Sequence, residues 1–133
     1  MKNILLVEDD RAMAEMTCQY LVLICDRLGF TCVVEVLTDG QKAVNNLLER
    51  PYDLILLDIG LPLLNGHEVL RRIRMGAIYT PVIILSSSNN PQDVHLAHLY
   101  GANGYLVKNK RLEANLAIVC QCFLNCLTPP HPD

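Results

Sequence analysis

The sequence predicts an α/β domain built on a doubly wound parallel sheet of five strands with five helices. Short apolar runs alternate with longer segments in which apolar residues recur every three or four positions, as expected for buried strands and amphipathic helices. The runs are apolar at consecutive positions, which is typical of strands covered by helices on both faces. With 133 residues, of which 51% are hydrophobic, the chain can bury the core of one domain.

The predicted strands are short apolar runs that end at polar residues or turns. The first run is too short for a helix, and the third and fourth are continuously apolar. The second is rich in β-branched residues, and the fifth is brief and follows a glycine. In chain order, the predicted strands cover residues 3–7, 31–37, 53–57, 81–85 and 104–107.

The predicted helices begin and end at local signals. Gly29 stops the first helix, and the turn at residues 38–40 caps the second, which ends before Pro51. Pro91 stands at the start of the fourth helix, and Gly101 closes it. In chain order, the predicted helices cover residues 11–28, 41–49, 67–75, 92–100 and 112–127.

Composition excludes several classes of protein. The formal net charge is −3 and the basic residues are scattered, which argues against nucleic-acid binding. No apolar run reaches the ~20 residues that span a bilayer, and the N-terminal apolar run is too short for a signal peptide. We therefore expect a cytoplasmic domain over residues 1–127, with no membrane contact, followed by a loose Pro-rich tail over residues 128–133.

The six cysteines are best explained as small hydrophobic residues buried in a reducing compartment. A zinc site in the C-terminal trio is the alternative. On a helix, Cys122 and Cys126 would share a face but Cys120 would not, and no histidine stands at a suitable spacing. The sequence therefore argues against zinc binding there.

Polar side chains follow four of the five predicted strands, and they are Glu8, Asp9, Asp10, Asp58, Ser86 and Lys108. In a parallel sheet the ligand crevice lies outside the carboxyl ends of the strands, so these side chains should meet there. Clustered carboxylates need a cation, and an all-oxygen set suits Mg²⁺. Lysine and hydroxyl groups complement phosphoryl oxygens, and aspartate beside Mg²⁺ can attack phosphorus. The set predicts a phosphoryl-accepting site.

Four segments resemble the receiver domain of two-component response regulators, in the order and spacing of that bacterial family. They are residues 4–10, residues 53–62 with Gly66, residues 81–87 and residues 101–108. The likeness covers roughly residues 2–127 and is greatest to single-domain, chemotaxis-regulator-like receivers. The Lys-Asn pair at residues 108–109 resembles the corresponding pair in the small regulators that work with bacterial phytochromes. The resemblance implies a flavodoxin-like receiver fold with strand order 2-1-3-4-5.

The resemblance also implies the chemistry of the site. Asp58 would be the phosphoacceptor, taking a phosphoryl group from a phosphohistidine of a sensor histidine kinase or phosphotransfer protein. Glu8, Asp9 and Asp58 would hold Mg²⁺, together with the backbone carbonyl of Gly60. Lys108 would pair with Asp58 at rest and with a phosphoryl oxygen after phosphorylation.

By the same resemblance, phosphorylation would switch protein–protein contacts. Ser86 would hydrogen-bond the phosphoryl group and draw its loop inward, and Tyr105 would be the rotameric switch. The contact surface would be formed by the helix at 92–100, the strand at 104–107 and the helix at 112–127. The apolar character of that last helix would also support a homodimer.

The sequence departs from the family pattern at two positions. Asn109 stands where proline usually follows the lysine, so we expect a trans peptide bond there. Gly60 places no side chain over the phosphoryl site, which should give hydrolytic water freer access. Three histidines, His67, His95 and His98, match no functional position and are expected at the surface.

Two other functions stay open. A constitutive pseudo-receiver would bind partners without phosphorylation, but all the residues of the phosphorylation site are present. A Mg²⁺-dependent phosphohydrolase would use Asp58 as nucleophile, yet it generally needs a cap and a second acid two residues later, where Gly60 stands. We therefore expect a switch that is not an enzyme, limited to phosphotransfer and autodephosphorylation.

Overall fold

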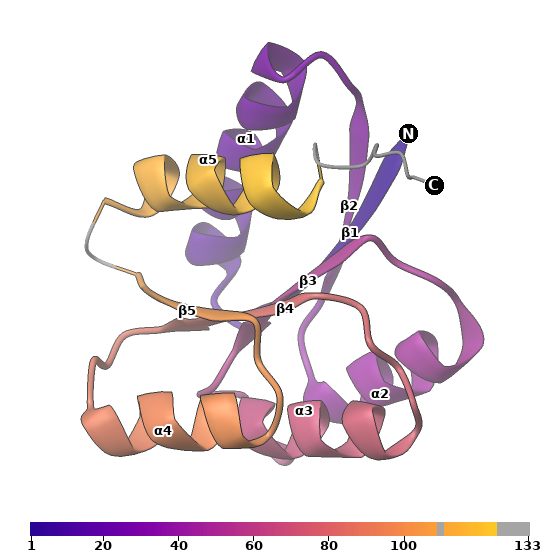
Figure 1. Cartoon of the computed structure of the whole chain (residues 1–133), viewed down its shortest axis with the longest axis vertical. Helices are drawn as coiled ribbons and strands as arrows, with labels where there is room; N and C mark the ends of the chain where they lie inside the picture. Colours follow the sequence, from indigo (N-terminus) through magenta and orange to yellow (C-terminus); the bar gives the residue numbers. More distant parts are fainter. Residues whose placement is uncertain (109–110, 125–133) are drawn as a thin grey trace, which may run out of the picture.

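The computed structural model describes residues 1–108 and 111–124 as a five-stranded parallel sheet between two layers of helices (Figure 1). The strand order is β2-β1-β3-β4-β5, which confirms the predicted fold class. The strands are β1 Lys2–Val7, β2 Cys32–Leu37, β3 Leu54–Asp58, β4 Val82–Ser86 and β5 Gly104–Val107. Each pairs in parallel with its neighbours.

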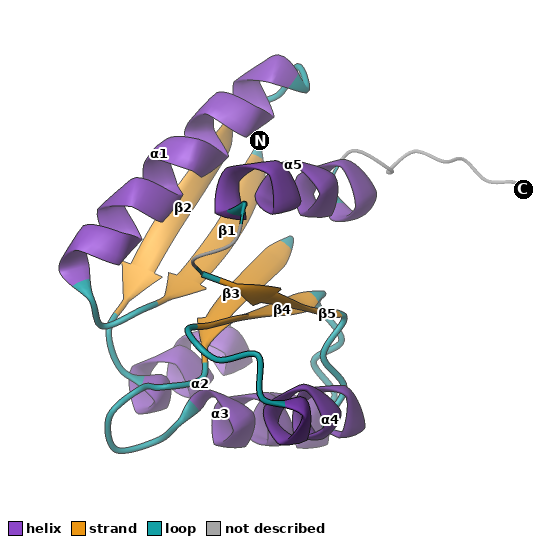
Figure 2. Cartoon of the chain, turned by 90° about the vertical axis from the view of Figure 1, so that its left-hand side faces the viewer, coloured by secondary structure: helices purple, strands orange, loops and turns teal. Residues whose placement is uncertain are grey.

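The five helices divide between the two faces of the sheet. They are α1 Arg11–Arg27, α2 Gly40–Glu49, α3 Gly66–Met75, α4 Pro91–Leu99 and α5 Leu112–Phe123. Helices α1 and α5 cover one face, and α2, α3 and α4 cover the other (Figures 1 and 2). The boundaries agree with the predicted ones within a few residues. The last predicted helical residues, 125–127, lie outside the described part of the chain, as do Asn109 and the predicted tail.

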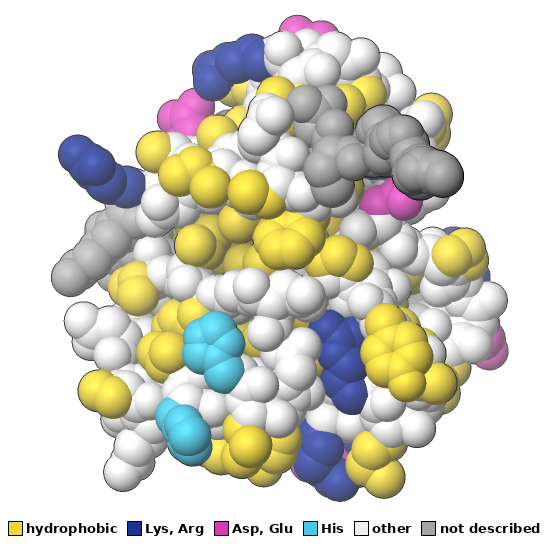
Figure 3. Space-filling view, viewed as in Figure 1, with side chains coloured by type: hydrophobic (Ala, Val, Ile, Leu, Met, Phe, Trp, Pro, Cys, Tyr) yellow, Lys and Arg dark blue, Asp and Glu magenta, His cyan; other side chains and the backbone are white. Residues whose placement is uncertain are grey.

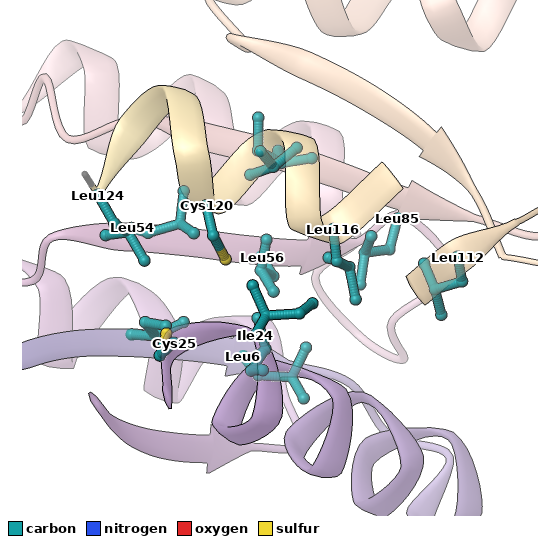
Figure 4. Close-up of a cluster of buried hydrophobic side chains, with 14 of the residues drawn as sticks. Leu6, Ile24, Cys25, Leu54, Leu56, Leu85, Leu112, Leu116, Cys120 and Leu124 are labelled. Carbon is teal, nitrogen blue, oxygen red and sulfur yellow. The ribbon is translucent and has the colours of Figure 1, made fainter. Parts of the chain in front are cut away.

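The alternation of side chains along the central strands produces two hydrophobic cores. In β1, Ile4 and Leu6 point to the α1/α5 face, whereas Leu5 and Val7 point to the opposite face. The α1/α5 core also contains the two fully buried cysteines, Cys25 and Cys120 (Figure 4). Because both faces are packed, β3 and β4 are buried along their whole length.

One edge strand is less covered than its sequence predicts. We expected β2 to be packed on both faces, but Val33 is 47% and Val36 38% exposed. The strand has a neighbour on one side only and lies at the margin of the helical layers. The helices cover the centre of the sheet more completely than its edge.

The helix termini match the predicted signals. Asp10 and Asp39 cap α1 and α2 through hydrogen bonds from the backbone N–H groups of Met13 and Lys42. Pro91 opens α4 after the capping residue Asn90. Gly29 and Gly101 follow α1 and α4 with positive φ angles, which only glycine adopts without strain.

The cysteines follow the predicted pattern only in part. Cys25 and Cys120 are buried free thiols, and burial raises the pKa of Cys25 strongly and that of Cys120 to about 11. Cys18 and Cys32 are half-buried. Cys122 is exposed on the outer face of α5, which corrects the expectation for that residue, and Cys126 lies outside the described residues. Within the described ranges, no helix is long and apolar enough to cross a membrane.

Candidate functional site

The predicted site residues meet in a pocket of about 400 Å³ at the carboxyl ends of the strands. Its walls are formed by Glu8, Asp9, Asp10, Asp58, Ile59, Gly60, Ser86, Ser87, Ser88, Asp93 and Lys108. Asp58 and Ser86 are the last residues of the adjacent strands β3 and β4. The backbone N–H of Lys108 donates to the Ser86 carbonyl over 2.8 Å, so strand pairing itself brings Lys108 to the pocket. Of the predicted site residues, only Tyr105 is not part of the wall.

Three carboxylates form the acidic centre of the pocket. Oxygen atoms of Glu8, Asp9 and Asp58 lie within 4.8 Å of one another. Glu8 and Asp58 are buried, whereas Asp9 is exposed. No other described histidine, cysteine, aspartate or glutamate residues form a group of three with this spacing.

Lys108 lies between two of the carboxylates. Its Nζ is 2.7 Å from Glu8 Oε1 and 3.3 Å from Asp58 Oδ2. The resemblance implied a pair with Asp58 alone, but the structure shows a bridge in which Glu8 is the closer partner. The reason is that Glu8 is almost fully buried and has a longer side chain, which reaches the ammonium group from β1.

Burial and charge shift two pKa values at this bridge. Burial raises the pKa of Glu8 above its usual range, and the hydrogen bond with Lys108 only partly opposes it. Burial alone would lower the pKa of Lys108, but the hydrogen bond with Glu8 and the charge of Asp58 outweigh it and raise that pKa. Lys108 therefore stays cationic in the pocket and partly neutralises the two acids.

The carboxylate of Asp58 is held from both sides. The backbone N–H of Gly60 donates to Oδ1 over 3.1 Å, and Lys108 contacts Oδ2. Gly66 packs against the backbone of Asp58, since a Cβ at this position would lie 2.4 Å from the Asp58 carbonyl oxygen. The strand end and its loop thus fix Asp58 with its side chain in the pocket.

The loop after β4 connects the pocket to Tyr105. The Ser86 hydroxyl oxygen accepts a hydrogen bond from the Ser88 backbone N–H over 3.0 Å. The Tyr105 hydroxyl donates to the Ser88 carbonyl over 2.8 Å. Tyr105 is half-buried and packs against the core on the α2/α3/α4 face. The two residues that the resemblance implied as switch residues therefore contact the same loop.

Sequence reasoning missed one residue of the pocket and misjudged the burial of its partner. Asp93, in the first turn of α4, lines the pocket although no motif includes it. Its partner His67 was expected at the surface, but the His67 side chain is only 13% exposed, because it packs between α3 and α4 beside Tyr100. The sequence did carry one signal that Asp93 lies near the pocket. Asp93 follows Pro91, which opens a helix, and helices α1 to α4 begin at this edge of the sheet. His95 and His98 are exposed, as predicted.

The donor atoms of the pocket suit a hard divalent cation. Carboxylate oxygens predominate, and no imidazole or thiolate of the described residues lines the pocket. Mg²⁺ is bound in proteins through one or two carboxylates with several waters retained, which a partly exposed acidic cluster allows. Asp10 caps α1 instead of joining the acidic cluster, because its side chain accepts from the Met13 N–H.

Comparisons with known proteins agree with this geometry. A family model described as the response regulator receiver domain matches residues 4–119. Response regulator ArlR of Staphylococcus epidermidis is 36% identical over 117 residues, which are 88% of this chain and 50% of ArlR. The chain thus spans about half the length of the curated relatives it matches.

Solved structures are similar over nearly the whole chain. The Mn²⁺-bound form of response regulator Rcp1 is 29% identical with a TM-score of 0.79, covering 98% of this chain and 100% of its own. The phosphorylated cyanobacterial phytochrome response regulator RcpA is 26% identical with a TM-score of 0.81, covering 98% and 99%. One of these neighbours thus binds a divalent cation, and the other is a phosphoprotein.

Proposed function

Because the chain belongs to the receiver-domain family of response regulators, we propose that it is a switch phosphorylated on Asp58. The phosphoryl donor would be the phosphohistidine of a sensor histidine kinase or phosphotransfer protein. The observation that carries the proposal is the meeting of Asp58 with two other carboxylates and Lys108 in one pocket. The phosphorylated state of the similar protein RcpA supports it.

The transfer needs one nucleophile and charge compensation. A carboxylate oxygen of Asp58 attacks phosphorus, forming a P–O bond while the P–N bond of the phosphohistidine breaks. The leaving imidazole nitrogen keeps the electron pair of that bond and is then protonated. Lys108 and the Ser86 hydroxyl line the pocket around Asp58, where they can donate hydrogen bonds to the transferred oxygens.

We assign the resident cation as Mg²⁺, held by Glu8, Asp9 and Asp58 and by the backbone carbonyl of Gly60. When bound, it supplies positive charge that compensates the carboxylates and the phosphoryl oxygens. Glu8 would contact both the cation and Lys108, because Lys108 Nζ already lies beside one of its two carboxylate oxygens. The Mn²⁺-bound form of the similar Rcp1 supports a divalent cation at such a site.

The output would be contact with another protein through α4, β5 and α5. Hydrophobic side chains gather between α4 and α5 on the face shown in Figure 3. Leu99 of α4 is 66% exposed and Ile118 of α5 is 61% exposed. Tyr105 connects this face to the phosphorylation loop through Ser88. A downstream protein or a second copy of the chain would bind there.

The two alternative functions remain less well supported. A constitutive pseudo-receiver would not require a lysine between Glu8 and Asp58, which is where Lys108 lies. A phosphohydrolase with Asp58 as nucleophile generally needs a second acid two residues later, where Gly60 stands with no side chain. We therefore propose a signalling switch without turnover of external substrates, acting in the cytoplasm.

Intact-mass spectrometry after treatment with acetyl phosphate and Mg²⁺ tests the proposal. The wild-type chain should gain one phosphoryl group, and the gain should disappear when Mg²⁺ is removed by a chelator. The Asp58→Ala variant should gain none. Asp10→Asn is the matched control, because Asp10 lines the same pocket but caps α1, and this variant should still be phosphorylated.

A folded wild-type chain that gains no phosphoryl group from acetyl phosphate or from phosphorylated histidine kinases would contradict the proposal. It would favour the pseudo-receiver. Multiple rounds of phosphate release from small phosphoesters would instead favour the phosphohydrolase.

A further inference from the structure

We propose that His67 is a positioning residue that ties Asp93, and with it the first turn of α4, to the N-terminus of α3 beside the phosphoacceptor pocket. The proposal deepens the proposed function, because it concerns how phosphorylation of Asp58 would move α4. It rests on one contact between two helices, on the burial of the imidazole, and on the weak attachment of α4 to the rest of the molecule.

The His67 side chain is mostly buried, with 13% exposed, and its one polar contact among the described residues is with Asp93. Its Nε2 lies 3.4 Å from Asp93 Oδ1, and its ring meets Tyr100 edge-on at a centroid distance of 6.3 Å. Its Nδ1 is buried and makes no hydrogen bond within the described residues. A buried nitrogen without a partner is unfavourable, and an apolar side chain would avoid that penalty. Leucine could not make the contact with Asp93, so this contact is the interaction that favours histidine at this position.

Asp93 stands at the wall of the phosphoacceptor pocket and belongs to the helix that would move. It lines the pocket together with Asp58, Ser86 and Ser88. A phosphoryl group adds about −1.5 to −2 charge near neutral pH, so phosphorylation of Asp58 would repel the Asp93 carboxylate. The hydrogen bond from His67 Nε2 opposes that repulsion and holds Asp93 toward α3.

Helix α4 has few other anchors at this end. Ala97 is its only fully buried residue. The chain that leads into it is held by two hydrogen bonds within the loop, from the Ser88 N–H to Ser86 Oγ and from the Asn90 N–H to Ser88 Oγ, and by one long-range hydrogen bond, from the Tyr105 hydroxyl to the Ser88 carbonyl. An element with so little buried surface can shift at low cost, so one contact between helices can set its position.

The arrangement defines two states. With the His67–Asp93 contact intact, the first turn of α4 stays against α3. When phosphorylation draws Ser86 toward the phosphoryl group and repels Asp93, the loop and the first turn of α4 move together. Loss of the contact should therefore raise the population of the shifted state before phosphorylation, and a more populated competent state is phosphorylated faster.

Hydrogen exchange and phosphorylation kinetics test the proposal on the whole chain. The variants are His67→Leu, Asp93→Ala and their double mutant. Exchange at the backbone amides of residues 92–95 should accelerate about threefold or more in each single variant, with the rest of the chain unchanged. Phosphorylation by acetyl phosphate should accelerate by a similar factor. The double mutant should equal the single variants, because both remove the same contact.

Two further variants separate positioning from general packing. His67→Gln keeps a side-chain N–H donor and should restore part of the wild-type exchange rate. His98→Leu changes an exposed histidine of α4 that does not contact Asp93, and it should have no effect. The proposal would be overturned if the rate increases of the two single variants multiplied in the double mutant. It would also be overturned if exchange accelerated throughout the chain. If the wild type takes no phosphoryl group, the proposed function fails, while the exchange experiment still decides whether the contact holds α4.

Discussion

At the scale of single residues, two glycines beside Asp58 lack a side chain for different reasons. A Cβ on Gly66 would lie 2.4 Å from the Asp58 carbonyl oxygen and 2.8 Å from Ile59 Cα, so neither backbone segment could stay in place. A Cβ on Gly60 would meet only Asp58 Oδ1, at 3.8 Å, which is an ordinary contact. Gly66 is therefore required by packing, whereas Gly60 leaves open the space over the phosphoacceptor.

The first prediction compares alanine at these two glycines. Gly66→Ala should lower the free energy of unfolding by about 3 kcal/mol, since overpacking against backbone cannot be relieved by a rotamer change. Gly60→Ala, the matched control, should change it little. Urea denaturation followed by circular dichroism measures both. Equal losses would show that the close approach of Gly66 to β3 is not what determines stability here.

The second prediction concerns the lifetime of phospho-Asp58. Gly60→Met should lengthen it severalfold, because a long side chain two residues after Asp58 can extend over the carboxylate and restrict water. The measurement is the decay of the phosphoryl group by mass spectrometry in Mg²⁺ after removal of acetyl phosphate. Gly60→Ala is again the control. A wild-type half-life of many hours would contradict the idea that Gly60 admits water freely.

At the scale of secondary-structure elements, Asp10 belongs to α1 rather than to the metal site. Asp10→Ala should lower the free energy of unfolding by about 1 kcal/mol, because the Met13 N–H loses its acceptor. Asp10→Asn can still cap the helix and should keep most of the stability. Thermal unfolding measures the effect. If Asp10→Ala also abolished phosphorylation without unfolding the chain, Asp10 would have a direct role in the pocket.

The first turn of α3 provides the pH-dependent prediction. Hydrogen bonds from Arg71 and Arg72 lower the pKa of Glu68 from 4.5 to about 2. A lowered pKa in the folded state stabilises the protein above the unfolded-state pKa, and this contribution is lost as the pH falls through the folded-state value. Because Glu68 is exposed to solvent, the effect should be small.

Glu68→Gln should therefore be less stable than wild type near neutral pH, with the difference shrinking steadily between about pH 4.5 and pH 2. Urea midpoints at several pH values measure it. Glu49→Gln, which changes an exposed glutamate on α2, is the control. A difference that stays constant down to about pH 2 would mean that the ionised pairs with arginine are not its cause.

At the scale of the whole molecule, the acidic pocket opposes folding until a cation binds. Oxygen atoms of Glu8, Asp9 and Asp58 lie within 4.8 Å of one another, and Lys108 contacts only Glu8 and Asp58 among them, so the three carboxylates repel in the folded state and separate in the unfolded chain. A cation that binds only the folded state adds about 2.7 kcal/mol when its concentration is one hundred times its dissociation constant. A divalent cation bound at this site would therefore stabilise the folded chain.

Asp9→Asn should accordingly raise the melting temperature in the presence of a chelator, because one repelling charge is removed. It should also lose most of the increase that Mg²⁺ gives the wild type. Differential scanning calorimetry with and without Mg²⁺ measures both effects, and Glu15→Gln, an acid on α1 outside the cluster, is the control. A variant that gains as much from Mg²⁺ as wild type does would remove Asp9 from the ligand set.

Much of the site could be predicted because strand ends are local features. Asp58 and Ser86 directly end apolar runs, and parallel strands deliver their carboxyl ends to one edge of the sheet. The family model of the receiver domain matches residues 4–119 and agrees with the predicted fold. The exposure of β2 was less predictable, because its apolar residues resemble those of a central strand until the edge position is known.

The sequence by itself determined the alternation of strands and helices, the helix caps and the set of polar residues at one edge, since each depends on residues close together in the chain. Only the tertiary structure decided that Lys108 lies closer to Glu8 than to Asp58 and that His67 contacts Asp93. Glu8 and Lys108 lie at opposite ends of the chain, and 26 residues separate His67 from Asp93. Such contacts depend on side-chain length and helix position after packing, which no local pattern encodes.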